Sequence, residues 1–344
     1  MLGVVIHAPH DLRIEPVAVP ELGPGEVRIA IEAGGICGSD LHYYHHGGFG
    51  TVRIKEPMVL GHEIAGVVAE AGAGVEHVRR GQRVAVDPSR PCGACRYCQE
   101  GTPRHCLDMR FLGSAMRFPH VQGGFRQMLV VAAAQAVPIA EGMSMAEAAM
   151  AEPLAVCLHA VRQAGPLLGR RVLVTGCGPI GILTVMAAHL AGATEIVATD
   201  LSAFTLGFAE RAGATTTLDI AAKPDALAAF TRDKGYFDVM FEASGSAAAL
   251  RGAFDALRPG AVIVQVGIGG EVALPMNVLV AKEFQLRGTF RFDQEFRLAV
   301  DLMGSGRIDV KPLVTETLPI ARADAAFKLA SDRQKAMKVQ LAFG

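Results

Sequence analysis

Two short stretches in the first half of the chain carry side chains that can bind a metal and move protons. Residues 35–42 read Gly-Ile-Cys-Gly-Ser-Asp-Leu-His, and residues 61–63 read Gly-His-Glu. Cysteine, histidine and glutamate are all Zn²⁺ ligands, and a catalytic zinc uses three protein ligands and one exchangeable position. The candidate ligands are Cys37, His62 and Glu63, with Glu152 as a fourth. Spacing alone leaves the alternatives of a small buried thiol, a core histidine, a surface carboxylate and a helix cap, because residues far apart in sequence have no fixed geometry.

A second group of metal-binding side chains consists of four cysteines within 15 residues, namely Cys92, Cys95, Cys98 and Cys106. The chain has 7 cysteines, which cannot all pair within one molecule. In a reducing compartment, such crowding is typical of a metal site rather than of disulfides. Four thiolates at this spacing favour a structural, tetrahedral zinc. An iron–sulfur cluster and free thiols are the alternatives.

The middle of the chain has the order of a dinucleotide-binding unit. A β-rich run at 172–175 is followed by a glycine turn, an apolar helix-like stretch to Ala191, and a second β-rich run at 196–199. Glycines in such a turn let the backbone approach a pyrophosphate at a helix N-terminus, and an acid about 20 residues later accepts the ribose hydroxyls. The residues predicted to bind the cofactor are Gly176, Gly178, Pro179, Ile180, Gly181 and Asp200.

The acid at the end of the second run predicts a preference for NAD over NADP. A 2′-phosphate next to Asp200 would bring two anions together, and residues 201–205 contain no Arg or Lys to offset them. We therefore expect NAD as the cofactor.

The composition indicates a folded protein with no bulk attraction to nucleic acid or anionic membranes. The chain has 344 residues, of which 51% are hydrophobic and 19% charged, and its net charge is −1. This length predicts about two domains of roughly 150 residues. No secretion signal is recognisable at residues 1–16, so we expect a cytoplasmic protein. An uncharged stretch of 23 residues at 172–194 is rich in glycine, and a strand, turn and helix explain it better than a membrane span does.

The order of elements predicts an α/β fold with a doubly wound parallel sheet beside a mostly β half. Six short apolar runs separated by helical lengths complete such a sheet. Residues 1–150 are rich in Val, Gly and Pro, with alternating runs such as 27–32 and 64–70, and carry the four-cysteine lobe as an excursion. A helical run at 296–303 and a strand-like run at 338–343 cannot be assigned from periodicity alone. The six expected strands are at 172–175, 196–199, 215–218, 237–241, 261–267 and 284–289.

These motifs, in this order, resemble the zinc-containing medium-chain alcohol and polyol dehydrogenases over essentially the whole chain. The strings that carry the resemblance are GGICGSDLHYY, PMVLGHE, PCGACRYC, AEPLAV and VLVTGCGPIGIL. Within the family, residues 108–116, 118–121 and 288–292 are most similar to relatives of sorbitol dehydrogenase that oxidise the sugar acid L-idonate. The resemblance thus implies a reversible, zinc-dependent and NAD-linked oxidation of a secondary hydroxyl, with L-idonate giving 5-keto-D-gluconate.

The resemblance also implies roles and a domain organisation. Cys37, His62 and Glu63 would hold the catalytic zinc, with Glu152 as an exchangeable or water-linked ligand, and the four-cysteine lobe would hold the structural zinc. Ser39 and His42 would relay the proton. A GroES-like catalytic domain would be discontinuous, formed by residues 1–150 and 287–344, with a Rossmann domain inserted at 151–286. The reaction would take place between the two domains. Sorbitol dehydrogenase relatives often form homotetramers.

Local charge bears on the substrate. Residues 102–127 contain four Arg, at positions 104, 110, 117 and 126, against one acid, Asp108. The guanidinium group suits a carboxylate, although any one of these Arg could simply lie on the surface. We expect Arg110 and Arg291 to bind a substrate carboxylate and Tyr43 to line the pocket or only pack. A neutral polyol such as sorbitol or xylitol is the alternative substrate, and a catalytically silent nucleotide-binding scaffold is the non-enzyme alternative.

Overall fold

The structure, a computed structural model, describes residues 1–344 as two compact units. Unit 1 comprises Met1–Glu152, Phe296–Asp332 and Ala336–Gly344, and unit 2 comprises Pro153–Glu295 and Arg333–Lys335. Helices α4 (Ala151–Ala164) and α9 (Glu295–Gly304) each begin next to a boundary between the units. The expected domain boundary at residue 287 falls within the last strand of unit 2, because that strand continues to Gly288.

Unit 2 is built on a parallel sheet with strand order β15-β14-β13-β16-β17-β18. In chain order this is 3-2-1-4-5-6, the order of a doubly wound dinucleotide-binding fold. The prediction of a parallel sheet from six apolar runs is therefore confirmed. The strands are β13 (Arg171–Thr175), β14 (Glu195–Asp200), β15 (Thr216–Asp219), β16 (Phe237–Glu242), β17 (Leu257–Gln265) and β18 (Gln285–Gly288).

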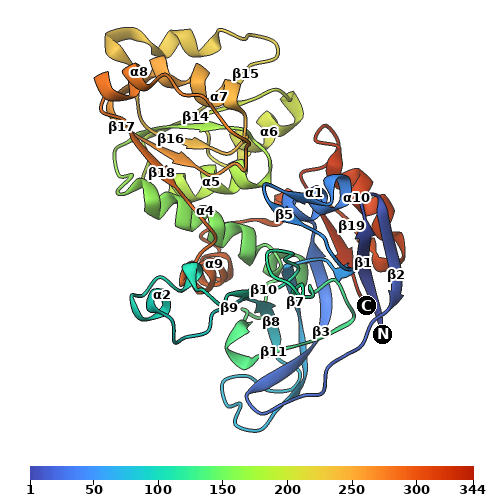
Figure 1. The fold of residues 1–344 in the computed structure, drawn as a ribbon. Coiled ribbons are helices and arrows are strands. Elements are labelled where there is room, and N and C mark those ends of the chain that lie inside the picture. The colour runs from blue at the N-terminus through green and yellow to red at the C-terminus, as the bar shows by residue number, and fades with distance from the viewer. The chain divides into compact units, whose positions relative to one another are not determined.

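Helices cover this sheet, which explains the continuous apolar character of its strands. Helices α5 and α6 pack against β13, β14 and β15 (Figure 1), and the side chains of residues 172–174 are fully buried, as expected for a strand covered on both faces. The uncharged stretch at 172–194 forms β13 and α5, and no helix of the structure has the length and apolarity to span a membrane. Besides α4, the helices of unit 2 are the two just described, α5 (Pro179–Leu190) and α6 (Ala203–Arg211), together with α7 (Ala247–Gly252) and α8 (Met276–Ala281).

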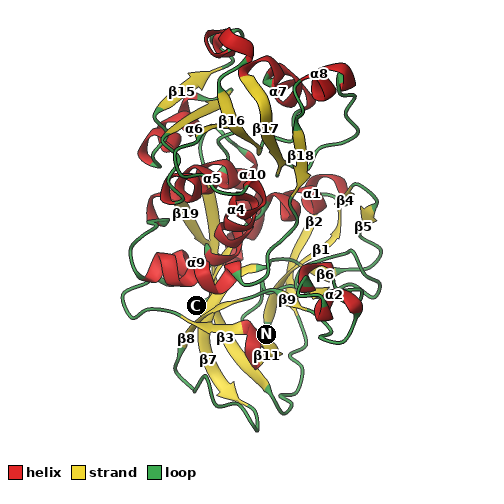
Figure 2. Cartoon of the chain, turned by 90° about the vertical axis from the view of Figure 1, so that its left-hand side faces the viewer, coloured by secondary structure: helices red, strands yellow, loops and turns green.

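Unit 1 is mostly β, as predicted, and its main sheet has the order β12-β8-β7-β3-β20-β19, with β11 also paired to β3. Strands β3, β7 and β8 lie side by side in it (Figure 2). The sheet strands are β3 (Glu26–Gly35), β7 (Glu63–Ala71), β8 (Arg83–Val86), β11 (Met128–Ala132), β12 (Ala136–Pro138), β19 (Val314–Pro319) and β20 (Lys338–Ala342). The smaller strands are β1 (Leu2–Ala8), β2 (Asp11–Pro16), β4 (Gly48–Phe49), β5 (Val52–Arg53), β6 (Met58–Val59), β9 (Ser89–Arg90) and β10 (Arg110–Phe111).

The C-terminal segment completes this unit. The apolar run at 296–303 lies in α9, and the run at 338–343 forms β20, which is inserted between β3 and β19. Residues of β20 share one core with the first half of the chain, including Leu341 and Phe125. The other helices of unit 1 are α1 (Gly38–His46), α2 (Arg96–Gln99), α3 (Met145–Ala148) and α10 (Ala323–Ser331).

Candidate zinc and dinucleotide sites

The structure brings Cys37, His62 and Glu63 together. One ligand atom from each lies within 4.8 Å of the others. Cys37 is the N-cap of α1, two residues after β3 ends, and Glu63 begins β7. Because β3 and β7 are antiparallel with Gly35 opposite Glu63, pairing of these two strands carries the three side chains to one place.

The carboxylate of Glu63 is held by Lys338, a residue that the sequence analysis did not select. Lys338 Nζ donates to both carboxylate oxygens, at 2.8 and 2.7 Å, and to the carbonyl oxygen of Ile36 at 3.2 Å. Both side chains are buried. A Cβ on Gly35 would lie 2.2 Å from Glu63 Oε2, so only glycine leaves room for this carboxylate. A charged residue at the start of an apolar strand was the available signal for Lys338.

His62 has a buried nitrogen with no partner. Its Nδ1 makes no hydrogen bond and lies 3.9 Å from Oδ1 of Asp40. Asp40 is fully buried, accepts hydrogen bonds from the backbone N–H groups of Cys37 (3.0 Å) and Gly61 (3.2 Å), and has its pKa raised by burial. Asp40 therefore links the two segments that carry the candidate ligands. A carboxylate beside the imidazole is the usual arrangement behind a zinc-binding histidine.

Glu152 is buried in the first turn of α4. Burial raises its pKa to about 8, with further contributions from Cys37 and Glu63. Burial and the nearby Glu63 raise the pKa of the Cys37 thiol to about 12. For Lys338, burial lowers the pKa but Glu63 and Cys37 outweigh it, and the net direction is upward. The geometric cluster of candidate ligands contains Cys37, His62 and Glu63 without Glu152.

These donors fit a zinc ion. A thiol, an imidazole and a carboxylate converge within coordinating range, and this mixed sulfur, nitrogen and oxygen set is one that Zn²⁺ accepts. The site collects several acids against one lysine, so a divalent cation would offset the excess negative charge.

The two residues expected to relay a proton lie on α1. Ser39 and His42 are three positions apart and therefore share one face of the helix. The backbone N–H of Ser39 donates to the sulfur of Cys37, which fixes the first turn of the helix against the candidate ligand. Tyr43 is buried in the core, and its hydroxyl accepts a hydrogen bond from the N–H of Ala115 at 3.0 Å. That placement favours the packing role for Tyr43.

The four-cysteine lobe is arranged as a second metal site. The sulfurs of Cys92, Cys95, Cys98 and Cys106 lie within 4.8 Å of one another. The Cys95 and Cys98 sulfurs are 3.6 Å apart, much longer than the roughly 2.05 Å of a disulfide. Backbone N–H groups donate to Cys92 and Cys106, and N–H donors from Leu107 and Cys98 lower the pKa of Cys95 to about 6. Such a set of thiols fits a structural Zn²⁺.

The glycine turn of unit 2 connects β13 to α5 as predicted. Gly176 has a φ of +85°, and a Cβ there would lie 2.7 Å from the backbone nitrogen of Ser244. A Cβ on Gly181 would lie 1.8 Å from the carbonyl oxygen of Gly176. Both positions therefore require glycine. Pro179 and Ile180 form the first turn of α5, where free backbone N–H groups can bind a phosphate.

Asp200 ends β14 beside this turn. Its Oδ2 accepts from the N–H of Cys177 at 2.6 Å, and its Oδ1 accepts from the N–H groups of Leu201 and Ser202. The carboxylate is thus fixed at the carboxyl end of the sheet, where an adenosine ribose binds in this fold. Sequence reasoning did not select Arg333, whose Nη1 lies 3.3 Å from the position of a Cβ on Gly178. The turn therefore has a cation beside it.

The arginines expected to bind substrate have different surroundings. Arg110 and Phe111 form β10, with Arg110 opposite Arg90 of β9. The ring of Phe111 lies 5.5 Å from that of His62. Because adjacent strand residues point to opposite faces, Arg110 points away from the side that meets His62. Arg291 lies in unit 2 and has a φ of +53°, with its guanidinium 4.8 Å from the ring of Phe290.

Two other arginines of the 102–127 segment, Arg117 and Arg126, are less accessible to a substrate carboxylate. Arg117 forms an ion pair with Asp108, which reduces the local excess of positive charge. Arg126 is buried.

Comparison with known proteins agrees with this geometry. Residues 23–141 match the family model of the alcohol dehydrogenase GroES-like domain, and residues 179–305 match that of the zinc-binding dehydrogenases. The chain is 45% identical over 318 residues to L-idonate 5-dehydrogenase (NAD(P)⁺) of Escherichia coli, covering 92% of this chain and 91% of that protein. It is 37% identical to the sorbitol dehydrogenase of Gallus gallus, covering 99% of this chain and 96% of that protein.

A solved structure gives the same result. The crystal structure of L-idonate 5-dehydrogenase from Escherichia coli matches with a TM-score of 0.95 and 42% identity, covering 99% of this chain and 98% of that one.

Proposed function

The chain belongs to the zinc-containing medium-chain dehydrogenases with a GroES-like domain, and from this premise we propose that it oxidises a secondary hydroxyl of a sugar acid, L-idonate first among the candidates, with NAD as the acceptor. The convergence of Cys37, His62 and Glu63 carries the proposal, since a dehydrogenase of this class needs an open zinc site. The similarity to L-idonate 5-dehydrogenase supports the substrate class.

The protein's own residues divide the work in this proposal. When bound, zinc supplies a Lewis acid that lowers the pKa of a hydroxyl, and NAD supplies the hydride acceptor. Cys37, His62 and Glu63 would hold the ion, with Glu152 as the exchangeable or water-linked ligand. Lys338 fixes the Glu63 carboxylate through two hydrogen bonds. Asp40 stands behind His62 and ties its segment to α1.

Proton movement is assigned to α1. The Ser39 hydroxyl would accept the proton of the substrate hydroxyl and pass one to His42, because both groups accept and donate. Their shared helix face allows this order. In unit 2, Asp200 would accept hydrogen bonds from the ribose hydroxyls, and the turn from Gly176 to Gly181 would hold the pyrophosphate.

The preference for NAD is supported by the position of Asp200. Its carboxylate is fixed by three backbone N–H groups, so it cannot easily turn away from a 2′-phosphate. The residue that follows, Leu201, is exposed and apolar and offers no positive charge.

The substrate is tested by a panel. Turnover is measured with L-idonate, sorbitol, xylitol and L-threonine at equal concentration, and the sugar acid is expected to give the highest kcat/KM. A clear advantage of sorbitol or xylitol would refute the sugar-acid assignment and leave the polyol alternative. Failure on every alcohol, with NAD binding retained and the catalytic zinc lost, would favour a silent nucleotide-binding scaffold.

The arginines are tested on the same panel. If Arg110 met the substrate carboxylate, Arg110→Ala would raise KM for the acid and leave KM for a neutral polyol nearly unchanged; because Arg110 lies on the face of β10 away from His62, we expect neither KM to change. An unchanged KM for the acid would assign that contact to Arg291 or to another group.

A homotetramer and a cytoplasmic location complete the proposal. The family resemblance supports the homotetramer, and the crowded thiols support a reducing compartment such as the cytoplasm.

A further inference from the structure

Unit 1 contains a pocket that the proposed reaction does not use. Its volume is about 590 Å³, within the range of roughly 300–1,000 Å³ typical of small-molecule sites. The lining comes from the first hairpin, from β6, and from β9, β10 and β11. None of Cys37, His62, Glu63 and Glu152 lines it.

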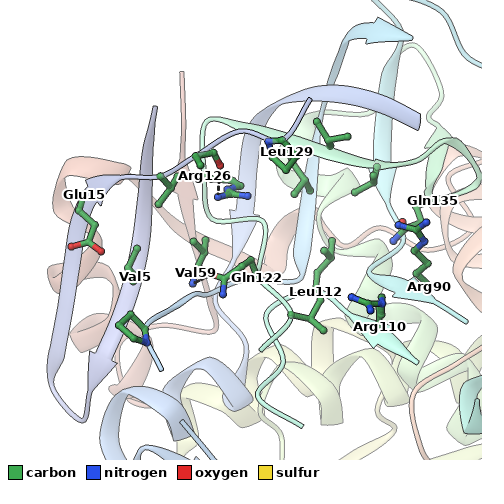
Figure 3. Close-up of a pocket in the computed structure, with 17 residues that line it drawn as sticks. Val5, Glu15, Val59, Arg90, Arg110, Leu112, Gln122, Arg126, Leu129 and Gln135 are labelled. Carbon is green, nitrogen blue, oxygen red and sulfur yellow. Dashed lines mark hydrogen bonds between the residues drawn. The ribbon is translucent and has the colours of Figure 1, made fainter. Parts of the chain in front are cut away.

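A buried guanidinium without a counter-charge lies in this lining. Arg126 is 7% exposed, and its Nη2 donates to the carbonyl oxygen of Ala18 at 3.0 Å. Its Nε is buried and makes no hydrogen bond. Arginine stays protonated in proteins, and a buried charge without a partner is strongly unfavourable. The guanidinium group therefore has a backbone acceptor but no counter-charge, and it lines a space where an anion could supply one (Figure 3).

Two further guanidinium groups line the same pocket. Arg90 and Arg110 are directly opposite each other on β9 and β10, a pairing of like charges that is destabilising. In Figure 3 they lie together, with Arg126 nearer the centre of the lining and Glu15 at the far side. Arg90 reaches Glu26 only at 4.0 Å.

The acid and amides of the lining are already engaged. Glu15 accepts from His7 at 3.1 Å. The amide oxygen of Gln122 accepts from the N–H of Val59 at 2.8 Å, and Gln135 bonds the backbone at Asp87 and Ala132. The lining thus offers the guanidinium groups of three arginines as hydrogen-bond donors. It also offers apolar surface from residues such as Val5 and Leu129.

Strand alternation separates this pocket from the candidate zinc. Phe111 meets His62, and Arg110, its neighbour in β10, lines the pocket on the opposite face. A ligand on Arg110 is therefore not a ligand of the zinc.

We propose that this pocket is a second, non-catalytic site for a small organic anion, whose carboxylate or phosphate groups pair with Arg126 and Arg110 and whose carbon skeleton packs on the apolar lining. Occupancy would stabilise unit 1, because an anion there supplies a counter-charge to Arg126 and reduces the repulsion between Arg90 and Arg110.

The test is thermal unfolding of the full chain, with zinc bound, in the presence of citrate or inorganic phosphate at constant ionic strength set by chloride. A saturable rise in Tm is expected, about 5 °C or more at a ligand concentration 100-fold above Kd. Arg110→Ala is expected to weaken the apparent affinity at least tenfold, and so is Arg126→Met. Arg80→Ala, at an exposed arginine of the same unit, is the matched control and should leave the affinity unchanged.

Two further variants separate the outcomes. If Arg126→Met does not fold, Arg90→Ala replaces it, with the same expected loss of affinity. Cys37→Ala should lose turnover and keep the anion-dependent rise in Tm; loss of that rise in Cys37→Ala would put the anion at the zinc and overturn the proposal.

The source of the anion is tested by sedimentation velocity. If Arg110→Ala changes the association state of the chain while citrate and phosphate have no saturable effect, an acidic side chain of a second copy fills the pocket, and the proposal is wrong. Equal effects of citrate on Arg110→Ala, Arg80→Ala and the unsubstituted chain would also refute it. A larger effect of citrate than of phosphate identifies carboxylates as the preferred groups.

Discussion

Replacing Lys338 with methionine tests whether the buried ion pair organises the candidate zinc site. The Lys338 side chain is 3% exposed, and its ammonium group donates to both carboxylate oxygens of Glu63, at 2.8 and 2.7 Å. Methionine has a similar length and no charge, so Lys338→Met removes both hydrogen bonds and the counter-charge that Lys338 gives to the buried Glu63 carboxylate. Removing one member of a buried pair costs about 3–5 kcal/mol. In a unit of this size each kcal/mol lowers Tm by about 2–4 °C, so we expect a fall of about 10 °C.

The chain offers a matched substitution at an exposed pair. Lys328 bonds Asp324 on α10 at 2.7 Å, with side chains 68% and 51% exposed. Because exposed pairs contribute about 0–1 kcal/mol, Lys328→Met should lower Tm by at most a few degrees. Unfolding is followed by circular dichroism, and the zinc content of each variant is measured because metal loss also destabilises the site.

A double substitution completes the test. Combining Lys338→Met with Glu63→Gln removes both charges, and it should recover more than half of the stability lost in the single variant, because replacing both partners is far less costly than orphaning one. Equal losses in Lys338→Met and Lys328→Met would refute the reasoning. So would a double variant as unstable as the single one.

Three further predictions follow from the sites. Cys37→Ala should abolish turnover and keep the fold, whereas Cys95→Ala should mainly loosen the four-cysteine lobe; limited proteolysis and kinetics distinguish them, and equal unfolding of both would contradict the division. Asp200→Ala should weaken NAD binding at least tenfold more than NADP binding, measured by fluorescence titration, and parallel losses would argue against the ribose contact. Burial raises the pKa of Glu295, but hydrogen bonds from His159 and the backbone outweigh it and hold the pKa at about 2, against an ordinary 4.5. The ionised carboxylate therefore contributes fully to folding stability above pH 4.5, and this contribution is lost as the pH falls toward 2. The full linkage between pH 6 and 3 is about 2 kcal/mol, so Glu295→Gln should reduce the loss of stability over that interval by about 1 kcal/mol once solvent screening is allowed for; a difference in unfolding free energy between the two proteins that is the same at every pH would exclude this linkage.

Local sequence signals were sufficient for the nucleotide-binding unit. The glycine turn, the acid and the apolar runs all act within about 30 residues, and the register of a parallel sheet follows from such repeated units. The structure adds the reason for the glycines, since a Cβ on Gly181 would collide with the carbonyl oxygen of Gly176.

Long-range pairing was beyond the sequence. Cys37 and His62 could be named from their types, but their meeting depends on the pairing of β3 with β7. Lys338 lies 275 positions from Glu63, and no periodicity links them. Arg110 shows the limit of composition: an excess of arginine indicated an anion, but only the alternation of β10 shows which way the side chain points.

The insertion of β20 between β3 and β19 also affects biosynthesis. Domains of a nascent chain generally fold in order as they leave the ribosome. Here the sheet next to Cys37 and His62 stays open at one edge until residues 338–342 have been made. Unit 2 is complete apart from its short 333–335 segment long before that. The nucleotide-binding unit can therefore begin to fold during translation, while the metal site gains its lysine only after residue 338 has been made.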